Sequence, residues 1–87
     1  MPPREARRQA RLTGLGQAIQ ARRKELGLSQ EQLGESVGGG QVHISRIENG
    51  HHAVRVDRLW AMCDALDVTP AELFTAATKF ASGETRQ

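Results

Sequence analysis

The segment 41–49 separates its side chains by type. Ile44 and Ile47 are three positions apart, so both fall on one face of a helix. The surface is left with smaller or polar side chains, namely Gln41, Val42, His43, Ser45 and Arg46. Glutamine can bond adenine through N6 and N7, arginine can bond guanine through O6 and N7, and valine can touch a thymine methyl group. Such a face has the chemistry to recognise base edges in the major groove of a duplex.

Other kinds of site find little support. Ser29 and Ser45 have no histidine and carboxylate partners at recognisable spacing, and the acidic residues are scattered, so we expect no enzyme. Three histidines and one cysteine do not form a metal-ligand pattern, because Cys63 falls on an apolar stripe. We therefore expect no metal and no cofactor; the histidines are His43, His51 and His52.

The charge of the 87-residue chain is uneven. Residues 1–27 hold seven basic and two acidic side chains, whereas residues 28–87 hold five basic and eight acidic ones, which gives +2 overall. A basic end on a near-neutral body favours contact with an anionic partner. Two interpretations of Arg4–Arg11 stay open: an arm that enters a minor groove, as in homeodomains, or a solvated tail.

Cysteine usage and hydropathy bear on the compartment. A single thiol builds no disulfide framework, which fits a reducing cytoplasm. No apolar run approaches the ~18–20 residues that span a bilayer, and the first residues are polar, unlike a signal peptide. We expect a cytoplasmic protein of a bacterium or phage, without membrane contact and associated with the nucleoid when bound.

Helix start and stop signals predict an all-α chain of five short helices. Ser29 with Gln32, and Thr69 with Glu72, form two capping boxes, the second followed by proline. Gly27 is placed to end the first helix. The expected helices cover about 13–26, 30–37, 41–49, 56–66 and 70–80; the first buries Leu15, Ile19 and Leu26, and the fourth buries Leu59, Met62, Cys63 and Leu66.

The same signals predict the domain organisation. Residues 1–12 are Arg-rich and form a basic N-terminal tail, residues 13–80 form the folded domain, and residues 81–87 form a flexible C-terminal tail. Within the domain, two capped helices separated by three glycines occupy about 30–49, which has the size and punctuation of a helix-turn-helix. In that motif the first helix holds the second one so that it projects from the surface of the protein. The second helix can then enter a groove about 12 Å wide.

Three pieces of the sequence, at consistent spacing, resemble the Cro/phage-repressor (XRE-type) helix-turn-helix family of DNA-binding transcriptional regulators. They are GLSQEQL, ISRIENG and LDVTPAELF, and the resemblance extends over Leu15–Phe74. It implies a Cro/phage-repressor-like five-helix fold with the helix-turn-helix at the second and third helices. It also implies double-stranded DNA as the partner and a third helix, starting near Gln41, that reads operator DNA.

The resemblance also implies residue roles. Gln41, Val42 and Arg46 would face base edges, while Gln30 would bond a phosphate and support the reading helix. Arg23 and Glu48 would form a structural pair that joins the first helix to the third. The remaining candidates, near the DNA backbone, are His43, Ser45, Asn49, His51, His52 and Arg55.

The sequence departs from the family pattern in three places. The turn usually carries an apolar residue, but here it is Gly38–Gly40, and Gly34 replaces a helix alanine. Each glycine lowers rigidity by roughly 1 kcal/mol, so the reading helix is expected to be poorly set until DNA binds. Arg55 stands where a capping serine or threonine is usual.

The sequence predicts a sequence-specific transcriptional regulator, with repression favoured, that acts as a homodimer on a pseudo-palindromic site. Phe74, Ala77 and Phe80 either form the dimer face or cover the core. Two alternatives stay open: an antitoxin or restriction-modification controller that also binds a partner protein such as a toxin or another regulator, and a protein-interaction module without DNA binding. The sequence leaves open the operator, the effector, and activation against repression.

Overall fold

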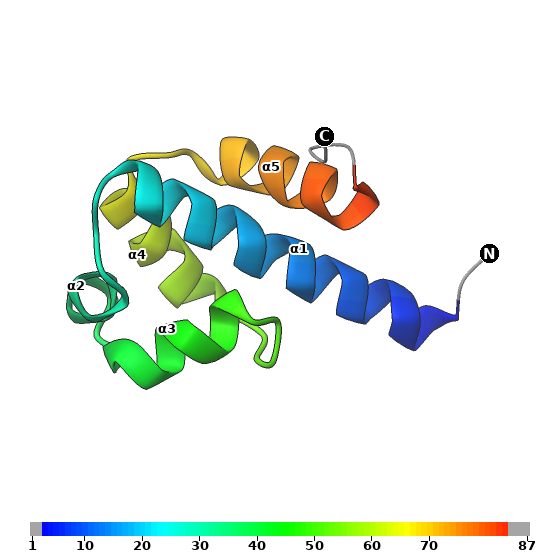
Figure 1. Ribbon diagram of the computed structural model, residues 1–87, viewed down its shortest axis with the longest axis horizontal. Coiled ribbons are helices and arrows are strands. Elements are labelled where there is room, and N and C mark those ends of the chain that lie inside the picture. Colours follow the sequence, from blue (N-terminus) through cyan, green and yellow to red (C-terminus); the bar gives the residue numbers. More distant parts are fainter. Residues whose placement is uncertain (1–2, 84–87) are drawn as a thin grey trace.

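Five helices make up the part of the chain that the computed structural model describes, residues 3–83. They are α1 (Arg4–Glu25), α2 (Gln30–Val37), α3 (Gly40–Glu48), α4 (Val56–Leu66) and α5 (Pro70–Ser82). In Figure 1, α1 runs along the molecule with α5 on one side and α3 on the other, and α2 lies at the end away from the N-terminus. The all-α, five-helix fold expected from the sequence is confirmed.

The predicted caps are present. The Ser29 hydroxyl accepts a hydrogen bond from the backbone N–H of Gln32 (3.0 Å), and the Gln32 side chain accepts one from the N–H of Ser29 (2.8 Å). Thr69 and Glu72 repeat the pattern at the start of α5 with the same two distances. Because each box satisfies two backbone donors that a helix start leaves unpaired, the starts of α2 and α5 are set by local sequence.

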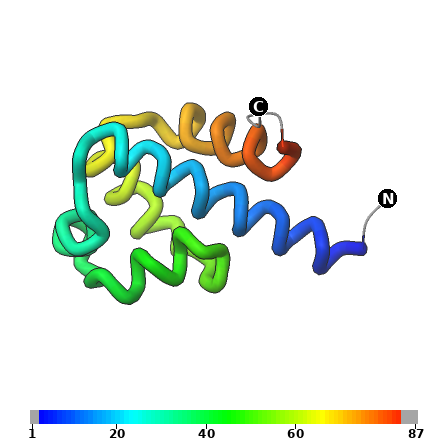
Figure 2. Tube along the Cα trace, in the orientation of Figure 1, coloured from blue at the N-terminus to red at the C-terminus, as the bar shows by residue number. Residues whose placement is uncertain are grey.

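The first helix is longer than the sequence predicts. It begins at Arg4, so the tail expected for residues 1–12 and the helix start expected near residue 13 are wrong for the described residues. Long-range contacts stabilise this extension. The Gln9 amide donates to Thr13 Oγ1 (3.1 Å) and to the backbone oxygen of Gly50 (3.0 Å), forty-one positions away. Figure 2 shows the resulting helix reaching well past the rest of the fold.

Other boundaries differ by little. The third helix runs over Gly40–Glu48 instead of 41–49, and the fifth continues to Ser82, so Ala81 and Ser82 are helical and do not belong to a tail. The rest of the predicted C-terminal tail, 84–87, lies outside the described residues. Leu26 is wrongly predicted as a core residue: it follows the last residue of α1 and is 40% exposed.

The core lies between α1 and the other four helices. Its largest members that are completely buried are Ile19, Leu33, Ile44, Ile47, Met62 and Leu66. The inward position predicted for Ile44 and Ile47 is thus confirmed, and Cys63 is buried beside them at 1% exposure. Leu15 and Leu59 pack against this cluster but are only half-buried. Burial on one face only leaves the other face of α3 at the surface.

Two glycines let α1 lie directly against its neighbours. A β-carbon at Gly14 would come within 2.5 Å of the backbone oxygen of Ala77 in α5. One at Gly16 would collide with the backbone oxygen of Ile47 and lie 2.6 Å from that of Glu48, both in α3. These glycines set the distances of α1 from α3 and α5.

Gly16→Ala should destabilise the fold by about 1–3 kcal/mol, since the added methyl group must displace α3 backbone. In an open helix position the same change would stabilise by roughly 0.5–1 kcal/mol, so the sign is informative. Urea unfolding measures the difference, and Gln17→Ala, at an exposed neighbouring position, is the control. A Gly16→Ala variant as stable as the wild type would contradict the close approach.

Candidate nucleic-acid interface

A buried ion pair joins α1 to the end of α3. Arg23 Nε lies 2.7 Å from Glu48 Oε2, and Arg23 Nη2 lies 3.0 Å from Glu48 Oε1. Nη1 of the same guanidinium donates to the backbone oxygen of Leu28 at 2.8 Å. Both side chains are buried, and hydrogen bonding to Glu48 raises the pKa of Arg23. The two-pronged geometry fixes orientation as well as distance.

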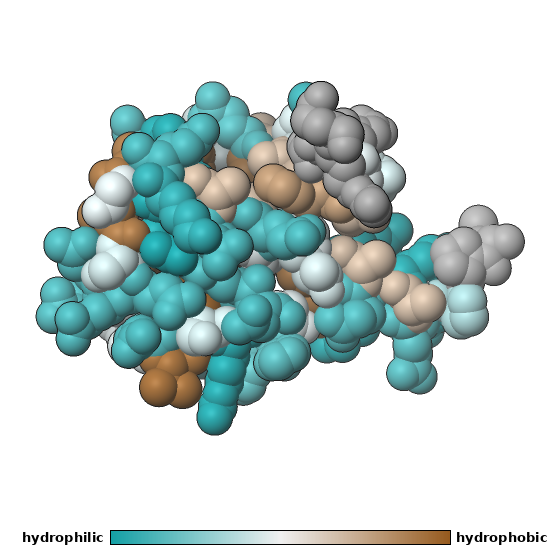
Figure 3. Space-filling view, in the orientation of Figure 1, coloured by the Kyte–Doolittle hydropathy of each residue, from teal (hydrophilic) through white to brown (hydrophobic). Residues whose placement is uncertain are grey.

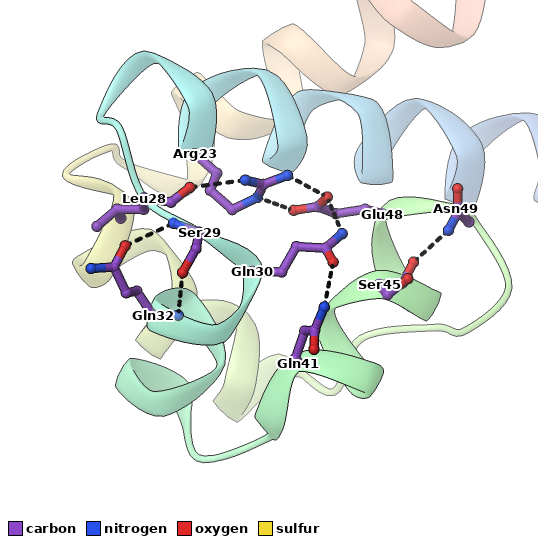
Figure 4. A network of polar contacts seen from close by, with 9 residues as sticks. All are labelled: Arg23, Leu28, Ser29, Gln30, Gln32, Gln41, Ser45, Glu48 and Asn49. Atoms are coloured by element: carbon purple, nitrogen blue, oxygen red, sulfur yellow. Dashed lines mark hydrogen bonds and ion pairs between the residues drawn. The ribbon is translucent and has the colours of Figure 1, made fainter.

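The ion pair continues into α2 and back to α3, as Figure 4 shows. The Gln30 amide donates to Glu48 Oε1 at 3.0 Å, so that one carboxylate accepts hydrogen bonds from two other helices. A longer contact of 3.5 Å runs from Gln41 Nε2 to Gln30 Oε1. The resulting network, Arg23–Glu48–Gln30–Gln41, connects α1, α2 and both ends of α3.

Removing one partner of the pair should be costly. In Glu48→Gln the buried guanidinium keeps its charge and loses its carboxylate, which typically costs about 3–5 kcal/mol. Urea unfolding at neutral pH measures the loss, with Glu35→Gln, an exposed residue of α2, as control. The double variant Arg23→Met/Glu48→Leu should recover much of it, because no charge is then buried. A loss below about 1 kcal/mol would show that the pair does not hold α3.

The candidate base-reading residues stand on the outer face of α3. Gln41, Val42 and Arg46 are exposed, Val42 to 64%, whereas His43 and Ser45 are half-buried. Figure 3 shows a mostly hydrophilic surface over this side of the molecule, with one small hydrophobic patch at its lower edge. An exposed helix face of amide, guanidinium and one small apolar group can donate to, accept from and touch base edges.

The candidate backbone-contacting residues surround that face. Asn49 is exposed, and its amide donates to the backbone oxygen of Ser45 at 2.9 Å. His51 and His52 are exposed in the loop after α3. Arg55, the residue before α4, makes no side-chain cap and lies 3.3 Å from Asp57 in an exposed ion pair. All four follow α3 directly along the chain, between its last residue and the start of α4.

A family model and one relative each match more than half of this chain. A model of the helix-turn-helix family matches residues 19–73. An uncharacterized HTH-type transcriptional regulator of Sinorhizobium fredii, y4aM, is 35% identical over 60 residues. The chain belongs to the Cro/phage-repressor type of helix-turn-helix transcriptional regulators. The match covers 69% of this chain but only 42% of the Sinorhizobium protein.

Two solved structures share the fold. The clp gene regulator ClgR of Corynebacterium glutamicum superposes with a TM-score of 0.80 at 24% identity, over 86% of this chain and 79% of that one. The restriction-modification controller protein C.AhdI of Aeromonas hydrophila gives 0.69 at 32% identity, over 71% and 94%.

This family member fills its turn in an unusual way. Gly39 has no side chain where the family pattern has an apolar one, and a β-carbon there would lie 2.5 Å from Arg58 Nη1 and 2.7 Å from His43 Cδ2. The Arg58 guanidinium and the His43 ring therefore occupy the space of the missing side chain. Arg58 was not among the residues predicted from the sequence. The only indication was a turn made of glycines, because the space left by the missing side chain must be filled from another helix.

His43 is held in a cationic environment. Burial lowers its pKa first, and the charges of Arg58, His52 and Arg46 lower it further. Its ring stands edge-on to that of His52, with centroids 6.2 Å apart. The imidazole is therefore harder to protonate in the folded chain than in the unfolded chain.

Stability should consequently fall as the solution is acidified past the ordinary pKa of histidine, about 6.5. Below that value the unfolded chain binds the proton that folded His43 resists, so the free energy of unfolding drops until the lowered pKa is reached. In His43→Gln this part of the drop should disappear, whereas His51→Gln, in the exposed loop, should keep it. Urea unfolding from pH 7.5 to 5 provides the curves; parallel wild-type and His43→Gln curves would refute the assignment.

Two arginines near the start of α1 lie beside α5. Gln9 contacts the loop after α3, whereas Arg7 and Arg11 line a groove against α5. The groove measures about 570 Å³, and its apolar lining includes Leu12, Leu15 and Phe74. A minor-groove role for Arg4–Arg11 gains no support from this orientation and stays a prediction.

The three residues expected to form a dimer face or to cover the core differ in exposure. Phe74 is 48% exposed in the groove with α1, Ala77 is buried beside it, and Phe80 is half-buried over a different hollow against Ala18 and Leu73. Ala77 thus serves the core, and only Phe74 is well exposed.

Two further findings concern residues 3–83 alone. No three histidine, cysteine, aspartate or glutamate side chains come together as metal ligands would. None of the five helices has the length and apolar character needed to cross a membrane.

Proposed function

We propose that this chain binds double-stranded DNA sequence-specifically and places the outer face of α3 in the major groove. The supporting observation is the exposed Gln41–Val42–Arg46 face on a helix whose end is fixed by the buried Arg23–Glu48 pair. Gln41 and Arg46 would make the bidentate contacts, to adenine and guanine respectively, and Val42 would touch a thymine methyl.

The DNA backbone would be held by the surrounding polar groups. Gln30 would bond a phosphate with the amide hydrogen that does not reach Glu48. Ser45, Asn49 and His51 would approach phosphates from the end of α3 and the loop after it. Such contacts fix the register of the protein on the duplex, and the base contacts give specificity.

We infer repression as the mode of regulation, because a bound protein that occupies a promoter excludes other proteins from it. The site of action would be the bacterial or phage nucleoid in the cytoplasm. Similarity to a restriction-modification controller at 32% identity supports a second candidate, a controller of neighbouring genes that also binds a partner protein. An adjacent endonuclease or toxin gene would favour this candidate.

A second copy completes the proposed site. One reading helix covers few base pairs, and family members commonly place two about 34 Å apart on a twofold site. A second copy would cover the apolar groove between α1 and α5, where Phe74 is 48% exposed.

Selection of bound duplexes from a random pool tests this function directly. The selected site should be a twofold repeat with half-sites about one helical turn apart. Affinity should fall roughly 10³–10⁵-fold between 50 and 200 mM salt if 6–10 phosphates are contacted. No enrichment at any salt concentration would favour a protein-interaction module.

Arg46→Ala should relax base preference at one position of each half-site, at a cost of about 1–3 kcal/mol for the preferred base. Binding titrations with duplexes varied at each position measure it. Lys24→Ala removes one exposed positive charge from α1 and should leave every preference unchanged. Preferences unaltered by Arg46→Ala would rule out the proposed reading face.

A further inference from the structure

The turn between α2 and α3 is covered by basic side chains from other parts of the fold. Gly38–Gly40 contributes no side chain of its own, and the Arg58 guanidinium from α4 and the His43 ring from α3 converge on Gly39. The His52 ring, from the loop between α3 and α4, meets His43 edge-on at 6.2 Å. Three different parts of the fold thus bring nitrogen donors to one place.

One of these donors has no acceptor. Arg58 Nη1 is fully buried and makes no hydrogen bond within the described part of the chain. Burying an unpaired polar group is costly, and more so for a charged one. An apolar side chain would fill the same space without that cost, so packing alone does not account for an arginine here.

The surrounding charges also lack an acidic partner. The charged groups that act on His43 are Arg58, His52 and Arg46, and all of them lower its pKa. The nearest acid in the sequence, Asp57, accepts from the backbone N–H of Arg58 and pairs with Arg55 at 3.3 Å, so it is engaged elsewhere. A compact set of nitrogen donors around one guanidinium, without a carboxylate, is the arrangement that an anion completes.

We propose that Arg58, His43 and His52 form a binding site for one phosphate group at the turn between α2 and α3. The ligand is a backbone phosphodiester of the bound duplex, so the proposal rests on the proposed DNA binding. In this arrangement Gly39 makes room for the Arg58 guanidinium, which performs two tasks: its Nη1 fills the turn, and its remaining N–H donors meet the phosphate. Gly39 and Arg58 then depend on each other, because any side chain at position 39 would collide with the guanidinium.

Arg58→Met separates these tasks, because methionine keeps a long apolar stem without the charge. Its thermal midpoint should equal or exceed that of the wild type, since the unpaired donor is gone. The slope of log affinity against log salt should become shallower by about 0.9, the value of one phosphate contact, with base preference unchanged. Arg58→Lys should restore most of the slope. Lys24→Met, which removes an exposed charge from α1, should keep the wild-type slope. An Arg58→Met variant with the wild-type slope would overturn the site.

A titration with inorganic phosphate tests the site without DNA. At constant ionic strength it should shift the ring-proton NMR signals of His43 and His52 saturably in the wild type and not in Arg58→Met. Equal or non-saturating shifts in both proteins would overturn the site even if duplex binding is normal. If the wild type bound no duplex, the proposed function would fall, and the phosphate titration alone would decide this site.

Discussion

The arrangement of the helices depends on the charge of one buried carboxylate. Glu48 is 5% exposed and ends α3, so it must find its partners within the protein or destabilise the fold. Arg23 of α1 meets both of its oxygens, and Gln30 of α2 meets one of them. These bonds join all three helices at one carboxylate. Because an apolar replacement of a buried pair is often as stable, the pair acts mainly by fixing where α3 lies.

Close backbone contacts also fix how near α1 lies to α3 and α5. Gly16 allows α1 to touch the backbone at the end of α3, and Gly14 allows it to touch α5. The ion pair and Gly16 act on the same end of α3 from one helix, so the outer face of α3 has little freedom to rotate inward. These contacts favour a reading face that is set before DNA binds, unlike the poorly set helix expected from the glycines of the turn, and few contacts then need to be ordered on binding. The filled turn at Gly39 supports the other end of α3.

Features that depend on neighbouring residues were predicted from the sequence, whereas features that depend on contacts between distant residues were not. The capping boxes at Ser29 and Thr69, the glycine stops, and the inward pair Ile44 and Ile47 depend on residues a few positions apart, and all were found from sequence. The start of α1 was missed because Gln9 is anchored to Gly50, far along the chain. Arg58 was missed because no sequence pattern in α4 indicates that its side chain fills the turn between α2 and α3. The Arg23–Glu48 partnership came from the family resemblance, not from spacing.

Amide chemical-shift mapping of the ¹⁵N-labelled protein with its selected duplex tests most directly whether α3 presents the DNA-binding face. The largest changes should fall on residues 41–46 and on the loop 51–55, with the α1–α5 groove around Phe74 unaffected by DNA beyond any dimer contact already present in the free protein. Changes concentrated on α1 and α5, with α3 unperturbed, would contradict the assignment of α3 as the reading helix.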